Sequence, residues 1–184
     1  RDNTAYTLIA DNFITQNKHR LNESFSSTND VYTFSMFVKP SGLRYLHIRL
    51  QGGSANVGKG FDLQEGTMIS GVYDGSNPLT ATSSSIEKYP NGWYRCSVTG
   101  TLTSGTGYML PAISSSPTTT DMDDDGSGTQ GMSIWGIQLE VGSSPTSYIP
   151  TSGSQVTRAA DVYTSTANLT ETFEPRGLLI EEAR

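Results

Sequence analysis

Hydrophobic and polar residues alternate one by one along several short stretches of this chain. The clearest is Val31–Lys39, where every second residue is apolar. Its apolar face consists of Tyr32, Phe34, Met36 and Val38. Because successive side chains of a strand point to opposite faces, this period predicts a half-buried β-strand.

A second alternating stretch, Leu43–Leu50, follows after the turn signal Pro40–Gly42. Leu46, Ile48 and Leu50 share one face of it, and Tyr45, His47 and Arg49 share the other. Two alternating runs on either side of a short turn predict a β-hairpin. We therefore expect these two strands to pair with each other.

Two later stretches also alternate. In Trp93–Thr99 the predicted inward residues are Tyr94, Cys96 and Val98. In Met132–Val141 the apolar residues that would share one face are Trp135, Ile137, Leu139 and Val141. Shorter strands are expected at Phe61–Gln64, Met68–Tyr73, Ser84–Lys88, Tyr108–Ile113 and, as an edge strand, Gln155–Tyr163. The glycine-rich segment Gly52–Gly60 and the polar segment Ser114–Gly131 are expected to be loops.

Many short strands separated by turn residues predict an all-β fold, a two-sheet antiparallel β-sandwich of the jelly-roll, concanavalin-like or galactose-binding-like kind. The composition agrees with this class. Charged residues make up 16% of the 184 residues, against ~25% in an average domain, and serine, threonine and glycine are abundant. Such a composition excludes a helical bundle and a doubly wound α/β enzyme.

The charge balance narrows the range of partners. Twelve Lys and Arg against 18 Asp and Glu give a net charge of −6, so no basic footprint for nucleic acid is present. No apolar stretch approaches the ~18 residues that a membrane-spanning helix needs, so membrane insertion is not expected. Cys96 is the single cysteine, which excludes an intrachain disulfide.

Several segments resemble one known family of protein modules. They are Tyr32–Ser35, Asn91–Val98, Ile134–Glu140, Pro145–Thr151 and Thr157–Asp161. Together they resemble jelly-roll modules of bacteriophage tail and virion proteins, which are similar to family 4/9-type carbohydrate-binding modules. That resemblance implies a glycan held on a sheet face or at loop tips, a place on a virion surface or outside the cell, and a role in host recognition.

The resemblance also implies a domain organisation. Residues 1–163 would form the β-sandwich module and residues 164–184 a linker towards a following module, since Pro175–Arg184 resembles the junction between such modules. The expected partners are a polysaccharide or surface glycan and neighbouring modules or subunits of the same oligomeric assembly.

The outward residues of the clearest strands are the candidate glycan-binding residues. They are Tyr45, His47, Arg49, Trp93, Arg95 and Gln138. If their strands share a sheet, they would form a surface of aromatic rings, guanidinium groups and amides. Rings cover the C–H face of a sugar, and planar donors and acceptors bind its hydroxyl groups. The alternative is an ordinary half-exposed sandwich face.

Asp121, Asp123 and Asp125 alternate before Gly126, as in the first half of a calcium-binding loop. The pattern then fails, because Met132 stands where an EF-hand has its bidentate glutamate. The sequence leaves two interpretations, a structural Ca²⁺ site and a solvated acidic loop. No other cofactor is indicated.

Catalytic patterns are absent from the sequence. No Glu-x-Asp-x-x-Glu run, no Gly-x-Ser-x-Gly elbow and no phosphate-binding loop occurs, and His19 and His47 are the only histidines. The sequence thus predicts a non-catalytic carbohydrate-binding module of a phage tail fibre or virion surface protein. The alternative is a structural building block of a fibre or capsid decoration.

Overall fold

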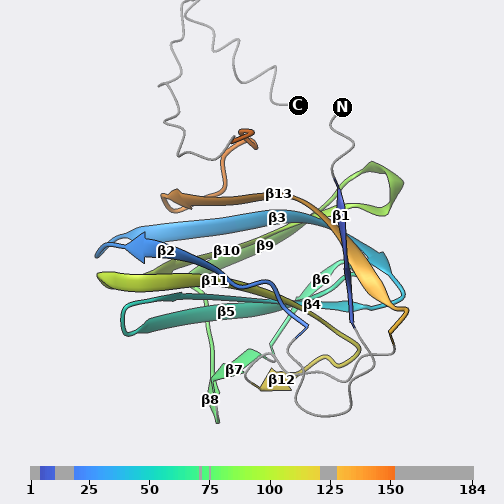
Figure 1. Ribbon diagram of the computed structural model, residues 1–184, viewed down its shortest axis with the longest axis horizontal. Coiled ribbons are helices and arrows are strands. Elements are labelled where there is room, and N and C mark those ends of the chain that lie inside the picture. Colours follow the sequence, from blue (N-terminus) through green and yellow to red (C-terminus); the bar gives the residue numbers. More distant parts are fainter. Residues whose placement is uncertain (1–4, 11–18, 71, 75, 121–127, 152–184) are drawn as a thin grey trace, which may run out of the picture. The chain divides into compact units, whose positions relative to one another are not determined.

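The computed structural model describes residues 5–10, 19–70, 72–74, 76–120 and 128–151, and these form an all-β fold (Figure 1). The strands belong to the unit Arg1–Pro150. The boundary predicted after residue 163 and the strand predicted at Gln155–Tyr163 lie outside the described residues.

Two antiparallel five-stranded sheets stack as a sandwich, which confirms the predicted fold class. Sheet A contains, in spatial order, β1 (Tyr6–Ile9), β13 (Gly131–Val141), β3 (Val31–Ser41), β10 (Tyr94–Thr101) and β9 (Ser83–Lys88). Sheet B contains β2 (Glu23–Ser27), β11 (Gly105–Ser114), β4 (Tyr45–Gly52), β5 (Ala55–Asp62) and β6 (Thr67–Ile69). One 3-10 turn, η1 (Pro90–Gly92), precedes β10.

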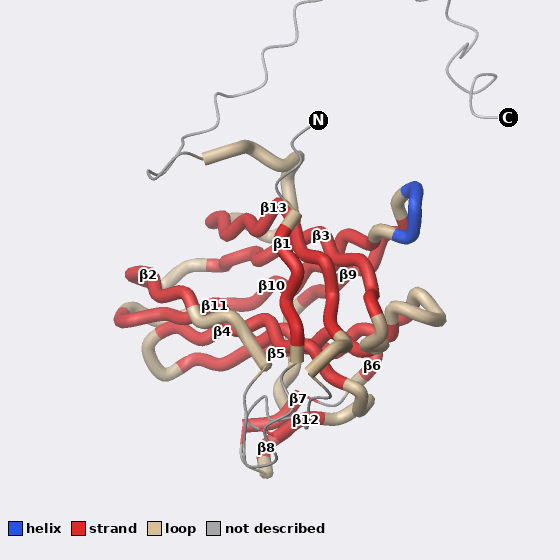
Figure 2. The backbone as a smooth tube through the Cα atoms, turned by 45° about the vertical axis from the view of Figure 1, so that its right-hand side comes forward, coloured by secondary structure: helices blue, strands red, loops and turns tan. Residues whose placement is uncertain are grey.

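A third, small sheet lies against sheet B on the side away from sheet A, as Figure 2 shows. It contains β12 (Thr119–Thr120), β7 (Val72–Asp74) and β8 (Asn77–Pro78). The expected single strand Met68–Tyr73 is therefore two strands, β6 and β7, which belong to different sheets.

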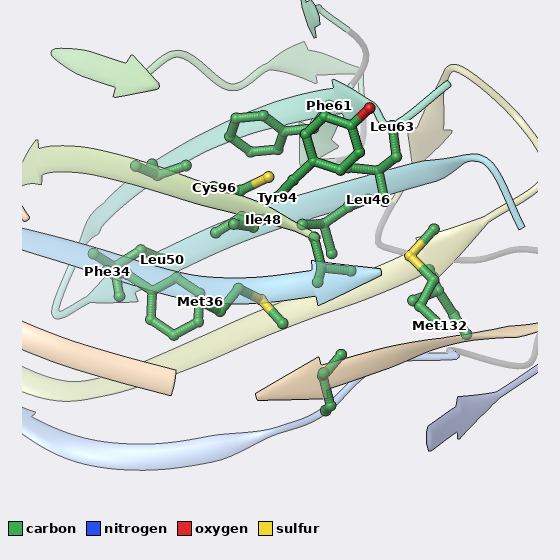
Figure 3. Close-up of a cluster of buried hydrophobic side chains, with 14 of the residues drawn as sticks. Phe34, Met36, Leu46, Ile48, Leu50, Phe61, Leu63, Tyr94, Cys96 and Met132 are labelled. Atoms are coloured by element: carbon green, nitrogen blue, oxygen red, sulfur yellow. The ribbon is translucent and has the colours of Figure 1, made fainter. Parts of the chain in front are cut away.

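The core lies between sheets A and B and is built from the alternating residues that the sequence indicated (Figure 3). Sheet A contributes Phe34, Met36, Tyr94, Cys96 and Met132, and sheet B contributes Leu46, Ile48, Leu50 and Phe61. All of these side chains are at most 7% exposed. The inward faces predicted for Val31–Lys39, Leu43–Leu50 and Trp93–Thr99 are thus confirmed.

The predicted hairpin between Val31–Lys39 and Leu43–Leu50 is wrong. β3 pairs with β10 and β13 in sheet A, whereas β4 pairs with β11 and β5 in sheet B. The turn after β3 carries the chain from one sheet to the other, with Gly42 at φ +100° and Leu43 buried in the core. A glycine accepts this positive φ without the strain that a Cβ would bring.

The predicted loop at Gly52–Gly60 is also wrong, because most of it forms β5. One of its glycines, Gly58, leaves room for the third sheet. A Cβ on Gly58 would lie 3.1 Å from Val72 Cγ1 and 3.1 Å from Leu79 Cβ. Glycines inside a strand often mark such a close approach of another layer.

The prediction that Trp135, Ile137, Leu139 and Val141 share one face of Met132–Val141 is wrong. β13 contains a bulge, where Gly136 and Ile137 stand opposite one residue of β3, and Gly136 has φ +60°. A bulge adds one residue to a strand and so exchanges the two faces beyond it. As a result Trp135 lies on the outer face with Gln138, and Leu139 packs against the core.

Candidate functional site

The outward residues of β4 lie beneath the third sheet. His47 is fully buried, and Arg49 is 8% exposed. His47 Nε2 lies 3.0 Å from the Ser116 carbonyl oxygen, and Arg49 contacts Asp74 at 3.2 Å in an ion pair. These two candidate glycan residues therefore contact the chain's own cover over sheet B.

Polar and apolar contacts together hold this cover. Arg49 Nε donates to Asn56 Oδ1 at 3.1 Å, and Asn56 Nδ2 donates to Asp74 Oδ2 at 3.3 Å. Beside this polar group, buried Val72 packs with Ala112 of β11 and with half-buried Leu79. The outer face of sheet B at this position is thus a small second core.

Tyr45, the third candidate on β4, is half-buried at the end of the strand. The Arg44 guanidinium lies 5.2 Å from its ring centre and donates two hydrogen bonds, of 2.8 and 2.6 Å, to the Asp62 carboxylate. These bonds hold the pKa of Asp62 below its usual value, although burial of the carboxylate opposes the shift. Arg44 and Asp62 therefore fix this corner of sheet B.

Arg95 and Gln138 lie on the outer face of the other sheet, A. There they bind the segment that follows β13, residues 142–150, which we call the strap. Arg95 donates to the Thr146 carbonyl oxygen at 2.5 Å and to Ser35 Oγ at 3.0 Å. Gln138 Oε1 accepts from the Ile149 backbone N–H at 2.9 Å. Both candidate side chains thus bond to the strap.

Glu140 also binds the strap. Its carboxylate accepts hydrogen bonds from the Thr146 backbone N–H at 2.9 Å and from Thr146 Oγ1 at 2.7 Å. Burial alone would raise the pKa of Glu140, but the hydrogen bonds from Gln138 and Thr146 and the charge of Arg95 together lower it. These contacts therefore favour the ionised form of the carboxylate.

Trp93 lies between η1 and β10 and is half-buried. Its backbone carbonyl accepts a hydrogen bond from Tyr89 N–H at 2.8 Å, which closes the turn. Three of the six candidate glycan residues thus belong to β4 of sheet B, whereas Arg95 and Gln138 belong to strands of sheet A. The condition that their strands share a sheet fails because the chain crosses between sheets after β3.

A row of aromatic rings, which sequence reasoning missed as a group, crosses the outer face of sheet A. Phe37 lies 5.1 Å from both Tyr89 and Trp135, and Trp135 lies 4.6 Å from Tyr148 of the strap, between ring centres. Arg95 lies 5.4 Å from the Phe37 ring centre. Tilted rings at these separations stabilise one another beyond their burial.

At one end of this row the surface is hollowed. The edge groove, as we call it, has a volume of about 180 Å³. It is lined by Tyr6, Ile134, Trp135, Gly136, Ile137 and Tyr148. Tyr6 is 72% exposed. The glycine after Trp135 within an otherwise alternating stretch was the sequence signal for this site, because it marks the bulge beside the groove.

The three aspartates of the possible calcium loop, Asp121, Asp123 and Asp125, lie outside the described residues. In the part of the chain that the structure describes, no three His, Cys, Asp or Glu side chains gather as a metal site. Cys96 is fully buried, and burial raises the pKa of its thiol.

Comparison with known protein families and with curated proteins found no match for this chain. Within the described residues, no helix is long and apolar enough to cross a membrane.

Proposed function

We propose that this chain is a non-catalytic carbohydrate-binding β-sandwich of a phage tail fibre or virion surface protein. The glycan would lie in the edge groove, and the six residues that the sequence singled out would serve other contacts. The observation that carries the proposal is a groove whose lining includes three aromatic residues, Tyr6, Trp135 and Tyr148, of which Tyr6 is 72% exposed. Aromatic rings around a shallow groove suit the apolar C–H faces of sugars.

Low affinity at one such site is compatible with the function. Repeated copies of a module, or of a subunit in an assembly, raise the effective concentration of each further site. Shallow grooves then hold a polysaccharide without a deep pocket.

Affinity electrophoresis and a glycan array test the proposal on the full chain. Tyr6→Ala removes an exposed ring and is expected to weaken glycan retention about tenfold without changing the unfolding midpoint. Met68→Ala removes a side chain that is 45% exposed on β6 and is expected to bind as the unmodified chain does. Retention that survives Tyr6→Ala but is lost in Tyr45→Ala would overturn the edge groove as the site.

A second candidate function is assembly, which one observation favours. Pairing of β1 with β13 ends at Ile134 within the described residues, and Val141 further along β13 is 63% exposed. An exposed apolar residue on a strand edge favours contact with another chain. If the protein forms ordered oligomers that Val141→Lys dissociates, and no glycan is retained, assembly is the function.

A further inference from the structure

A second groove adjoins the edge groove. It lies between the two sheets and has a volume of about 200 Å³. We call it the interlayer groove; its lining includes Leu21, Glu23, Phe34, Met109, Pro111 and Ile137. Phe34 is fully buried. Most of the lining residues are apolar, and Glu23 adds one carboxylate from the start of β2.

Ile137 lines both grooves. It is one of the two residues of the β13 bulge and is 38% exposed. A regular strand would alternate through this position, whereas the bulge leaves Ile137 between the outer face of sheet A and the space between the sheets. The two grooves thus adjoin at a single side chain.

The volumes of the two grooves favour one ligand that occupies both. Sites for small molecules usually enclose about 300–1,000 Å³, and each groove alone is smaller than that. A ligand that extends over Ile137 contacts both grooves and buries more of its surface than either allows.

We propose that the two grooves form one track for an extended, uncharged glycan chain, with sugar units on both sides of Ile137. This inference rests on the proposed function and adds the shape and the charge class of its ligand. The edge groove would hold one unit against the aromatic rings, and the interlayer groove would hold a further unit against Met109 and Pro111.

The charges around the track favour an uncharged ligand. Among the described residues that line the two grooves, Glu23 is the charged one, and it would repel a carboxylate or sulfate. The guanidinium groups of Arg49 and Arg95, which would attract an acidic glycan, contact Asp74 and the strap. The net charge of −6 adds a general repulsion of polyanions.

Isothermal titration with cello-, laminari- and malto-oligosaccharides of increasing length tests the track. For the series that binds, affinity is expected to rise about tenfold once the chain is long enough to cross Ile137, and then to level off. Hyaluronan and alginate fragments of equal length are expected to bind at least tenfold more weakly.

Variants separate the two grooves. Asn22 is exposed and lines the interlayer groove, so Asn22→Trp fills that groove at a surface position. We expect it to remove the gain from chain length while the binding of short sugars stays unchanged. Ser26→Trp places the same ring on an exposed position of β2 and serves as the control.

The outcomes distinguish the track from the function on which it rests. If Asn22→Trp binds long sugars as the unmodified chain does, or if affinity is independent of length, the track is wrong and the edge groove alone is the site. If the acidic fragments bind more tightly, the charge class is wrong. If no glycan binds in any series or on the array, the proposed function itself is overturned.

Discussion

The outer faces of sheets A and B are both covered by the chain itself, but in different ways. Over sheet B the third sheet packs Val72 and Leu79 against a strand in which glycine leaves the space. Over sheet A the strap is held by hydrogen bonds: Arg95 donates to the Thr146 carbonyl oxygen, Glu140 accepts from the Thr146 N–H, and Gln138 accepts from the Ile149 N–H. Polar contacts hold both covers, but the cover of sheet B also packs a fully buried valine, whereas the strap adds the ring contact of Tyr148 with Trp135.

This difference shows which kind of cover should be harder to remove. Burial of apolar side chains contributes about 1.5–3 kcal/mol for each large one, whereas a hydrogen bond contributes about 0.5–1.5 kcal/mol net. We therefore expect substitutions under the third sheet to cost more stability than substitutions at the strap.

The largest effect is expected for Gly58→Val. The new side chain would meet Val72, Leu79 and the Ile48 carbonyl oxygen, all 3.1 Å from its Cβ. Overpacking of this kind costs about 1–3 kcal/mol, and we expect the upper end because backbone is among the contacts. Urea unfolding measures the loss.

The matched control for this substitution is Ser83→Val, which adds the same side chain to an exposed position of β9. It should change stability by less than about 0.5 kcal/mol. Equal losses in the two variants would show that the third sheet does not pack tightly on Gly58.

A smaller loss, about 2 kcal/mol, is expected for Val72→Ala. Val72 is 1% exposed, so the truncation removes two buried methyl groups and leaves a cavity between the third sheet and sheet B. Val141→Ala removes the same groups where the side chain is 63% exposed and should change the free energy of unfolding by less than about 0.5 kcal/mol. Thermal unfolding of both variants would measure the difference, and similar midpoints would contradict it.

At the strap, Arg95→Met is expected to cost about 1 kcal/mol, because it removes the hydrogen bonds to Ser35 and Thr146 while keeping the aliphatic stem. Amide hydrogen exchange should accelerate at Thr146 and Ile149 and stay unchanged in β4. Lys39→Met, which removes another cation from sheet A, is the control. Unchanged exchange at both strap amides would mean that Arg95 does not hold this segment.

The smallest effect concerns pH and Glu140. Because the folded-state pKa of Glu140 is below its ordinary value of 4.5, its carboxylate stabilises the fold above that value. This contribution is lost as the pH falls through the lowered pKa. Glu140→Gln should therefore cost less than about 1 kcal/mol near neutral pH and nothing in strong acid. Glu87→Gln on exposed β9 is the control, and parallel pH curves for the two variants would contradict the role of Glu140.

The alternation of residues predicted which side chains point into the core, for example Phe34 and Ile48, because burial requires one apolar face. It did not predict which strands pair. The turn residues Pro40–Gly42 indicate that the chain changes direction there. The same residues are compatible with a hairpin and with a crossing between sheets. That difference depends on contacts with strands far away in the sequence.

The same limit applies to the candidate glycan residues. Period-2 alternation shows that His47 and Arg95 point away from the core, and both do. Whether such residues reach the solvent depends on a further layer, and the layers here come from short segments with weak signals of their own. Gly58 of β5 and the Trp135–Gly136 pair were the local signs of those layers.

The crossing of the chain between sheets after β3 also bears on how the protein folds. The next strand along the chain, β4, belongs to the other sheet, so the partners of β3 come from far along the chain. Thr33, for example, contacts Gly142 across 109 positions. Folding rates fall as the mean sequence separation of contacts rises, so this sandwich belongs among slow, millisecond-to-second folders. During synthesis, most of the domain is made after β3 and before β13, the last strand that pairs with it. Until then one edge of the central strand of sheet A is open to pairing with other chains.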